Sequence, residues 1–279
     1  METVKLVADI KAKISKFKDE GKTIGFVPTM GALHKGHLSL TEASVKNNDI
    51  TVVSIFVNPT QFNNPNDLST YPRTLEADLE QLSHYNPDLI FIPEVSEIYP
   101  EPDTRKFDFG LLDRVMEGKN RPGHFNGVAQ VVSKLFDIVN PDNAYFGQKD
   151  FQQVAVIKQM TQDLKLNVNI VSCPIIREKD GLAMSSRNLL LSEEQRKNAC
   201  KISETLFKAR NLAAELSVHE LKDWVIKEIN KNSYLSVEYF EIVNDTSLEE
   251  IKDWKELNNK VGCITVQVGK IRLIDNITF

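Results

Sequence analysis

The feature that most constrains the fold is a nearly unbroken run of apolar and β-branched residues at positions 50–57, ITVVSIFV. A strand with one face in water alternates apolar and polar residues, whereas a continuous run is typical of a strand buried on both faces of a parallel sheet. A second apolar run at 24–27 ends at Pro28, which has no N–H to donate to a neighbouring strand. Segments with helical periodicity separate such runs, so the sequence predicts an α/β fold.

The pattern changes in the last third of the chain. Up to residue 176 we expect further strands at 89–92, 143–147 and 168–172, with helices at 3–18, 38–45, 74–84 and 125–139 and another ending at 164. Beyond it, capping boxes at Ser192 to Gln195 and Ser217 to Glu220 open helices at 193–215 and 218–230. Strands at 237–243, 262–268 and 270–274 follow, for which we expect antiparallel pairing. The sequence therefore predicts a first domain at 1–176 and a smaller α+β domain at 177–279.

Charge and hydropathy exclude two classes of partner. The 279 residues carry a net charge of −5 and contain no long basic run, which argues against nucleic acid. No apolar segment approaches the ~18 residues that span a membrane, and the N-terminus alternates apolar and charged residues, unlike a secretory signal. We therefore expect a cytoplasmic protein without a membrane partner.

Two histidines follow the apolar run at 24–27. Gly31 and Gly36 let the backbone approach a ligand closely, and the helix that begins near Gly36 offers free N–H groups to an anion. His34 and His37, three residues apart, can donate to the same phosphate oxygens, which indicates a nucleotide-phosphate site. Incidental surface histidines remain an alternative. A zinc pair is another, although a third ligand at suitable spacing and the HExxH pattern are both absent.

Polar side chains also follow the strand at 50–57. Asn58 and Gln61 lie where the strand leaves the carboxyl edge of the sheet, the edge at which open α/β sheets bind their ligands. Their amides suit a hydroxyl or a carboxylate. An ordinary turn is the alternative, because Asn and Pro are common in turns. In the helix at 74–84 that comes next, we expect Asp78 and Gln81 on the exposed surface.

Two more polar segments come later in the chain. Lys149 can pair with phosphates and Asp150 can accept from ribose hydroxyls, so one loop could bind ATP at two points. Ser185, Ser186 and Arg187 form a short set of donors for phosphate oxygens. A solvated helix cap and a linker are the respective alternatives.

Six short motifs in this order resemble the pantothenate synthetase family. They are PTMGALHKGH at 28–37, NPTQF at 58–62, YPRT at 71–74, RPGHF at 121–125, FGQKD at 146–150 and MSSRN at 184–188. The resemblance runs from about residue 25 to 188, with a fainter match at 272–276. The histidine loop is also similar to the HxGH signature of nucleotidyltransferases and class I aminoacyl-tRNA synthetases.

The resemblance implies a fold and a reaction. It implies a Rossmann-type first domain, a smaller α+β lid domain and a homodimer. The implied reaction joins (R)-pantoate to β-alanine with ATP and Mg²⁺ through a pantoyl adenylate, releasing AMP and pyrophosphate. Two alternatives remain open: a nucleotidyltransferase that retains the nucleotide in its product, and a catalytically silent ATP-binding sensor.

The resemblance also implies roles for individual residues. The catalytic groups would be His37, His34 and Lys149, with His37 as general acid or phosphate donor. Gln61, Gln153, Asn58 and Met30 would bind substrate, and Gln61 would also border β-alanine. Asp78 and Gln81 would contact the metal, although Ala77 stands where relatives often carry a second acid. The ATP site would comprise Met30, Gly31, Ala32, Leu33, His34, Lys35, Gly36, His37, Gly147, Gln148, Lys149, Asp150, Ile176, Met184, Ser185, Ser186 and Arg187.

Overall fold

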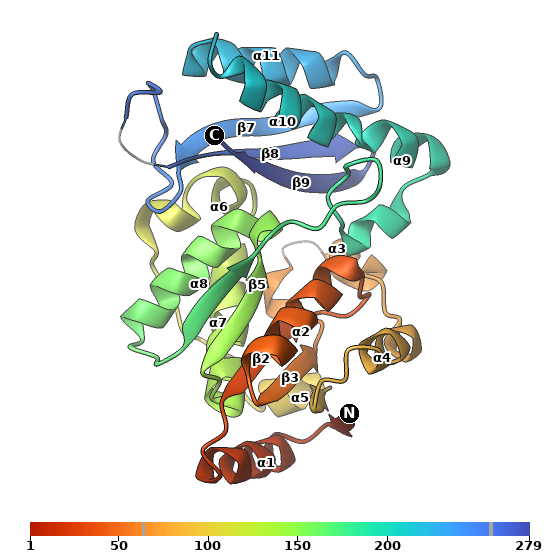
Figure 1. Ribbon diagram of the computed structural model, residues 1–279, viewed down its shortest axis with the longest axis vertical. Coiled ribbons are helices and arrows are strands. Elements are labelled where there is room, and N and C mark those ends of the chain that lie inside the picture. The colour runs from red at the N-terminus through yellow and green to blue at the C-terminus, as the bar shows by residue number, and fades with distance from the viewer. Residues whose placement is uncertain (63–64, 257–258) are drawn as a thin grey trace.

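Two sheets lie one above the other in the computed structural model, which describes residues 1–62, 65–256 and 259–279 (Figure 1). Within these residues six parallel strands form the larger sheet, in the order β1-β4-β3-β2-β5-β6. The strands are β1 (Glu2–Val4), β2 (Ile24–Thr29), β3 (Ile50–Ile55), β4 (Leu89–Phe91), β5 (Asn143–Gly147) and β6 (Asn169–Cys173). The predicted α/β architecture is confirmed.

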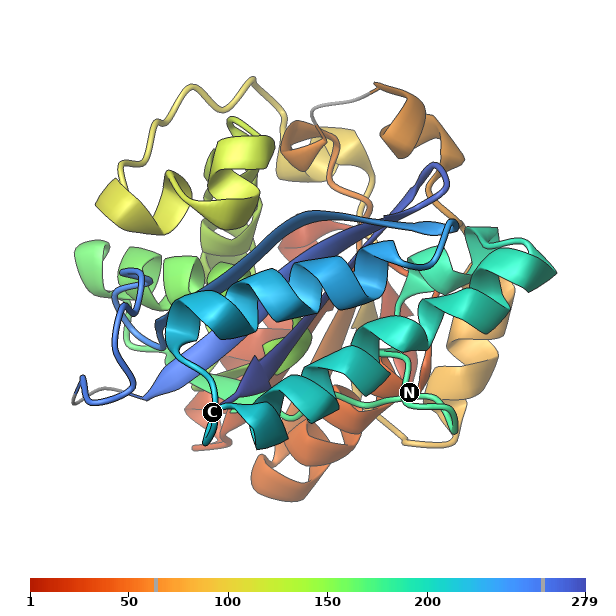
Figure 2. The same cartoon turned by 90° about the horizontal axis from the view of Figure 1, so that it is seen from above.

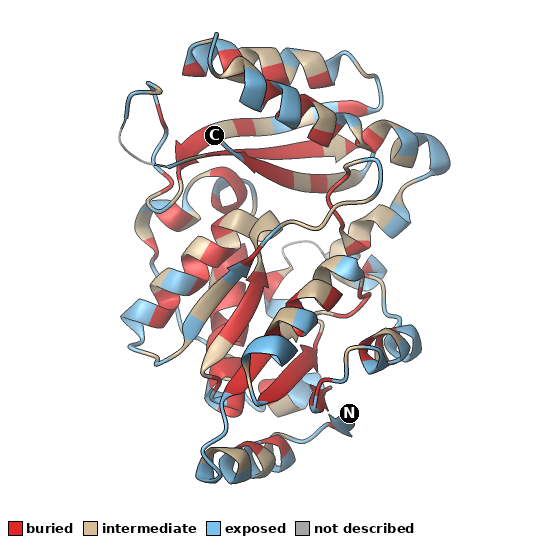
Figure 3. Ribbon diagram, viewed as in Figure 1, coloured by how far each residue is buried: buried red, intermediate tan, exposed pale blue. Residues whose placement is uncertain are grey.

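Helices cover both faces of this sheet, which explains the continuous apolar runs. Successive residues of β2 point to opposite faces, so Phe26 and Val27 belong to separate cores. One core contains side chains from α1 (Val7–Asp19), α7 (His124–Val139) and α8 (Phe151–Asp163). The other contains side chains from α2 (Lys35–Asn47) and α4 (Leu75–Ser83). In Figure 3 the strands are largely buried while the outer helices carry the exposed residues.

The strand order creates a switch point between β2 and β5. From β2 the chain proceeds to β3 and β4 on one side, and later to β5 and β6 on the other. The crossovers that leave β2 and β5 therefore diverge, and their carboxyl ends frame a crevice where α/β proteins bind ligands. The histidine loop and the Lys149 loop both start from this crevice.

The second sheet is antiparallel and stands over that crevice. Its strands are β7 (Leu235–Asn244), β8 (Lys260–Val268) and β9 (Ile271–Thr278), paired in that order. Two helices, α10 (Lys201–Leu212) and α11 (Val218–Asn230), pack on its outer face (Figure 2). Both predicted capping boxes are present, at the starts of α9 (Glu193–Ala199) and α11. The antiparallel pairing is confirmed as well.

Two predicted helices differ in the structure. The helix expected at 3–18 begins only at Val7, because residues 2–4 pair with β4 as an edge strand. Val4 is buried in the same core as Ile10, so its spacing fits a strand followed by a helix equally well. The helix expected at 193–215 is interrupted at Cys200. Apolar residues on both sides of the break reach one core, and periodicity therefore cannot reveal it.

Short helices occupy the remaining connections. They are η1 (Pro59–Gln61), α3 (Pro65–Thr70), α5 (Val95–Ile98), η2 (Gly110–Asp113), α6 (Met116–Asn120), η3 (Gln148–Asp150) and η4 (Ser186–Leu190). In the described part of the chain, no helix has the length and apolar character needed to cross a membrane.

Candidate active site

Two adjoining cavities open at the carboxyl end of the parallel sheet. The smaller, about 200 Å³, lies at the crevice between β2 and β5. The larger, about 710 Å³, lies between the parallel-sheet part and the inner face of the second sheet. Their shared wall is formed by Lys149, Asp150, Gln153, Ser185 and Arg187. Together they offer room for a nucleotide and small substrates.

The histidine loop is held in shape by Asp78 of α4. Its carboxylate accepts from the backbone N–H groups of Ala32 (2.9 Å) and Leu33 (2.8 Å) and from the Thr74 hydroxyl (3.1 Å). Gly31 has φ of +80°, and a Cβ there would lie 3.0 Å from the Asp78 carboxylate. The glycine is therefore required both for its conformation and for the close approach.

The structure corrects the expectation for α4. Only 1% of Asp78 is exposed, because α4 packs beneath the histidine loop, so the predicted surface position is wrong. Gln81 donates to the Leu33 carbonyl at 3.5 Å. Neither residue lines either of these two cavities, so their contacts give no support to a role as metal ligands. Nor do three metal-binding side chains converge anywhere in residues 1–62, 65–256 and 259–279, which leaves the zinc alternative without a third ligand.

The two histidines stack at the start of α2. Their ring centroids are 4.0 Å apart, and Nδ1 of His34 accepts from the Gly36 N–H at 3.1 Å, which caps the helix. A Cβ on Gly36 would lie 2.8 Å from the His34 ring, so a larger residue would displace the ring that caps the helix. Nδ1 of His37 is buried and has no hydrogen-bond partner within the described residues.

Both imidazoles are neutral at pH 7. Burial, reinforced by the Lys149 charge, lowers the pKa of His34 to about 4. Burial, followed by His34 and Lys149, lowers the pKa of His37 well below its ordinary value. Because Nδ1 of His34 is an acceptor, its proton resides on Nε2. The pair can thus donate hydrogen bonds to an anion without carrying charge, which makes a donor role for His37 more suitable than that of general acid.

The side chain of Asn58 is committed to the protein itself. It is 1% exposed, donates to Gln61 Oε1 and to the Gly127 carbonyl (3.2 Å each), and accepts from Tyr99 (2.9 Å). Asn58 lines the smaller cavity, and these contacts make its side chain a support for Gln61, while its predicted contact with substrate stays a prediction. The sequence pattern could not distinguish the two roles.

The amides of Gln61 and Gln153 are more available. Of the described residues, the Gln61 amide nitrogen meets only the weak acceptor Met30 Sδ, at 3.2 Å. Gln153 lines both cavities, and its side chain has no hydrogen-bond partner in the part of the chain that the structure describes. These two amides are therefore the ones free to hold a small polar ligand.

The Lys149 loop is clamped from the second sheet. Asn276 of β9 donates to the carbonyls of Gln148 (2.8 Å) and Lys149 (3.0 Å). The neighbouring Asp275 forms a bidentate ion pair with Arg177, at 2.6 and 2.9 Å. Within the described part of the chain, the Lys149 ammonium has only a loose contact with Asp150, at 3.4 Å, and so remains able to bind an anion.

The segment 184–187 completes the smaller cavity. The Ser186 hydroxyl donates to the Ala32 carbonyl at 2.9 Å, which ties this segment to the histidine loop. Arg187 pairs with Asp67 at 3.0 Å, and Ser185 caps η4. His37, Lys149 and Ser186, which lie far apart in the sequence, thus line one cavity.

The structure brings most of the predicted site residues to that cavity. Those that line it are Met30, His34, Gly36, His37, Asn58, Gln61, Gly147, Lys149, Asp150, Gln153, Ile176, Met184, Ser185, Ser186 and Arg187. Those that line neither cavity are Gly31, Ala32, Leu33, Lys35, Asp78, Gln81 and Gln148. The second group shapes the loops or points elsewhere.

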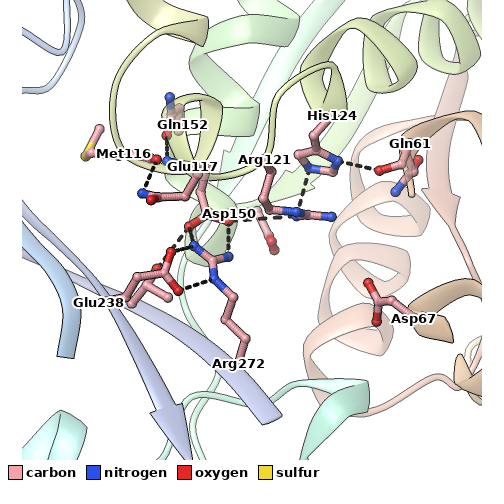
Figure 4. Close-up of polar contacts among 12 residues, drawn as sticks. Gln61, Asp67, Met116, Glu117, Arg121, His124, Asp150, Gln152, Glu238 and Arg272 are labelled. Atoms are coloured by element: carbon pink, nitrogen blue, oxygen red, sulfur yellow. Dashed lines mark hydrogen bonds and ion pairs between the residues drawn. The ribbon is translucent and has the colours of Figure 1, made fainter. Parts of the chain in front are cut away.

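Sequence reasoning missed a buried polar network in the larger cavity (Figure 4). Glu117 accepts from Arg272 (2.5 and 2.6 Å), Tyr239 (2.7 Å) and Thr265 (2.9 Å) of the second sheet. His124 links this network to Gln61, because it forms hydrogen bonds with both Arg121 and the Gln61 carbonyl. The motif at 121–125 signalled His124, but nothing in the sequence pairs Glu117 with a residue 155 positions later.

We expect Asp78→Asn to destabilise the fold. The amide can offer only one oxygen to the Ala32 and Leu33 N–H groups, and its NH₂ would face a buried donor. An unsatisfied buried donor costs about 1–3 kcal/mol in the free energy of unfolding, which urea denaturation measures. Glu76→Gln, on the exposed face of the same helix, is the matched control. Equal stability of the two variants would contradict the role given to Asp78.

Comparisons with known proteins cover the whole chain. A family model described as Pantoate-beta-alanine ligase matches residues 2–278. Pantothenate synthetases of Bacteroides fragilis (strain YCH46) and Porphyromonas gingivalis (strain ATCC BAA-308 / W83) are 53% and 54% identical to it. Each alignment covers 100% of this chain and 99% of the relative.

Solved structures show the same similarity. The crystal structure of pantothenate synthetase from Thermus thermophilus matches with a TM-score of 0.93 and 41% identity, covering 99% of both chains. The pantoate-beta-alanine ligase of Francisella tularensis, complexed with beta-gamma ATP and β-alanine, matches with a TM-score of 0.83 and 36% identity. That match covers 100% of this chain and 97% of the other.

Proposed function

This chain belongs to the pantoate-beta-alanine ligase family, and from that membership we propose that it joins (R)-pantoate to β-alanine in an ATP-dependent reaction. The observation that carries the proposal is the convergence of the histidine loop, the Lys149 loop and the segment 184–187 on one cavity. Groups that can donate hydrogen bonds to phosphate line this cavity together with the amides of Gln61 and Gln153. This is the set of groups that activation of a hydroxy acid by a nucleotide requires.

The proposed reaction has two steps. A carboxylate oxygen of pantoate attacks the α-phosphorus of ATP, the bond from this phosphorus to the bridging oxygen breaks, and pyrophosphate leaves. The amine of β-alanine then attacks the acyl carbon of the pantoyl adenylate, AMP leaves with the bonding electrons, and the nitrogen loses a proton. The first step makes a leaving group that a free carboxylate lacks.

The residues act by alignment and charge neutralisation. In the proposal, His34 and His37 donate N–H groups to phosphate oxygens, and Lys149 and Arg187 supply positive charge. Gln61 and Gln153 hold pantoate for in-line attack. Such positioning and electrostatic stabilisation suffices for transfer at phosphorus, and no covalent nucleophile is required.

Magnesium enters the proposal through the nucleotide. Mg²⁺ binds oxygen ligands and usually retains substrate phosphates and waters in its shell. Asp78 is buried and committed to the histidine loop, whereas the Asp150 carboxylate lines both cavities and has only a loose contact with Lys149. The site therefore fits an ion carried mainly by phosphate oxygens, with Asp150 as a carboxylate that lines the smaller cavity. When bound, the ion neutralises negative charge on the phosphates.

The second part of the chain, 177–279, is proposed to act as a lid. The inner face of its sheet forms one wall of the larger cavity, and Asn276 holds the Lys149 loop. Exclusion of water would protect the adenylate from hydrolysis. A homodimer and a cytoplasmic location complete the proposal; sedimentation velocity measures the former and cell fractionation the latter.

We expect the protein to exchange labelled pyrophosphate into ATP when pantoate is present and β-alanine is absent. The exchange reports reversible adenylate formation alone, and AMP should then appear only slowly because the lid excludes water. Addition of β-alanine should release AMP stoichiometrically with pantothenate. A product that retains the nucleotide would favour a nucleotidyltransferase, and ATP binding without exchange would favour a sensor. Rapid AMP release without β-alanine would contradict the lid.

A further inference from the structure

The guanidinium of Arg121 occupies an unusual position in the larger cavity. Its side chain is only 22% exposed and follows α6 directly. Nη1 donates to Nε2 of His124 at 3.1 Å, while the nearest carboxylate oxygen, on Glu117, is 3.8 Å away. Figure 4 shows Arg121 between the Glu117–Arg272 pair and His124. Among the residues that the structure describes, its positive charge thus lacks a close carboxylate partner.

The other two guanidinium groups that line this cavity in the described part of the chain each form ion pairs with carboxylates. Arg272 pairs with both Glu117 and Glu238, and Arg187 pairs with Asp67. Glu117 cannot also pair closely with Arg121, because its carboxylate already accepts hydrogen bonds from Arg272 and from two hydroxyl groups. A largely buried cation without a close counter-charge is costly, which indicates that an anion completes the site.

His124 fixes where that anion would bind. Its Nδ1 donates to the Gln61 carbonyl at 2.8 Å, and its Nε2 accepts from Arg121. Burial, followed by the charge of Arg121, lowers the pKa of His124 to about 4, so the ring is neutral and can hold this orientation at pH 7. Arg121 therefore lies two hydrogen bonds from Gln61, on the side of the larger cavity.

The three proposed substrates carry several anionic groups, and one of them has not yet been given a binding residue in the protein. The ATP phosphates face the histidine loop, Lys149 and Arg187, and the pantoate carboxylate is the reacting group. β-Alanine, in contrast, attacks with its amine and carries its carboxylate two methylene groups away. That carboxylate would lie beyond Gln61 while the amine faces the acyl group.

We propose that Arg121 binds the carboxylate of β-alanine and selects this amine over amines that lack a carboxylate. The proposal rests on the proposed function. The planar guanidinium can pair with both carboxylate oxygens, which a single ammonium cannot do with the same geometry. Its hydrogen bond with His124 keeps the guanidinium facing the cavity.

The test separates the two half-reactions. For Arg121→Gln we expect kcat/KM for β-alanine to fall about 10- to 100-fold, the loss typical of one hydrogen-bonded charge pair. Pantoate-dependent pyrophosphate exchange should stay at the wild-type level. The wild type should prefer β-alanine to 3-aminopropanol by at least about 10-fold, and the variant should lose most of this preference. Lys270→Gln, which removes an exposed cation from the same cavity, should change neither quantity.

The possible outcomes are distinct. Loss of exchange in Arg121→Gln, with its melting temperature unchanged, would assign Arg121 to ATP or pantoate and overturn the inference. If Arg121→Gln prefers β-alanine to 3-aminopropanol as strongly as the wild type does, the inference is overturned as well. If Arg121→Gln fails to fold, Arg121→Lys replaces it, because it keeps the charge. An equal preference of the wild type for both amines overturns the inference without any variant. Absence of exchange in the wild type would instead refute the proposed function.

Discussion

His37→Ala is expected to lower turnover by roughly 10²- to 10³-fold, the usual effect of removing one donor to a developing charge. His37 lines the smaller cavity and its ring is neutral, so it contributes an N–H and no charge. Within the described residues its Nδ1 has no partner, so the protein does not fix the tautomer there and a bound group can set it. The fold should persist, because the variant breaks no hydrogen bond of this ring.

The measurement is pantoate-dependent pyrophosphate exchange together with a thermal melt. His219→Ala is the matched control, since this imidazole lies on α11 and its side chain is 86% exposed. The pKa of His34 is about 4 and that of His37 is lowered well below its ordinary value, so both rings are unprotonated at pH 7 and above. Neither histidine should then cause an inflection in kcat/KM, which reports the pKa values of the free enzyme, between about pH 7 and 9. Wild-type turnover in His37→Ala would refute the role.

The fold was predictable where each segment carries its own signal. The run at 50–57 reports burial on both faces, and Ser192 and Ser217 mark helix starts through contacts within one turn. β1 was missed because it exists only through pairing with β4, more than 80 residues away. A pattern of apolar spacing contains no information on such a partner.

The site was predictable to a different extent. The histidine loop, the Lys149 loop and the segment 184–187 each carry donors that suit phosphate, and strand topology then brings them together. Asp78 was wrongly expected on the surface and the contacts of Asn58 within the protein were not foreseen, because a polar side chain that supports a loop looks the same in sequence as one that faces a ligand or solvent. The environment of Arg121 depends on Glu117 being occupied by the second sheet, which only the folded structure reveals.

The network around Glu117 leads to the second large prediction, which concerns stability. Burial alone would raise the pKa of Glu117, but the hydrogen bonds and charge of Arg272, with a hydrogen bond from Tyr239, lower it from 4.5 to about 2. A shift of this size corresponds to about 3 kcal/mol of stability. We expect Glu117→Gln to lose about that amount at pH 7, because Arg272 would then retain only Glu238 as a charged partner.

The pH dependence gives this prediction its test. A carboxylate whose folded pKa is depressed stabilises the fold fully above its unfolded pKa, near 4.5, and loses that contribution as pH falls toward 2. The difference in unfolding free energy between wild type and Glu117→Gln should therefore narrow to about half between pH 6 and 3, as urea denaturation can measure. Glu238→Gln removes a more exposed partner of the same guanidinium and should lose only about 1 kcal/mol or less. Equal losses in the two variants, or a Glu117→Gln difference that does not change with pH, would show that the network does not stabilise the packing of α6 on the second sheet.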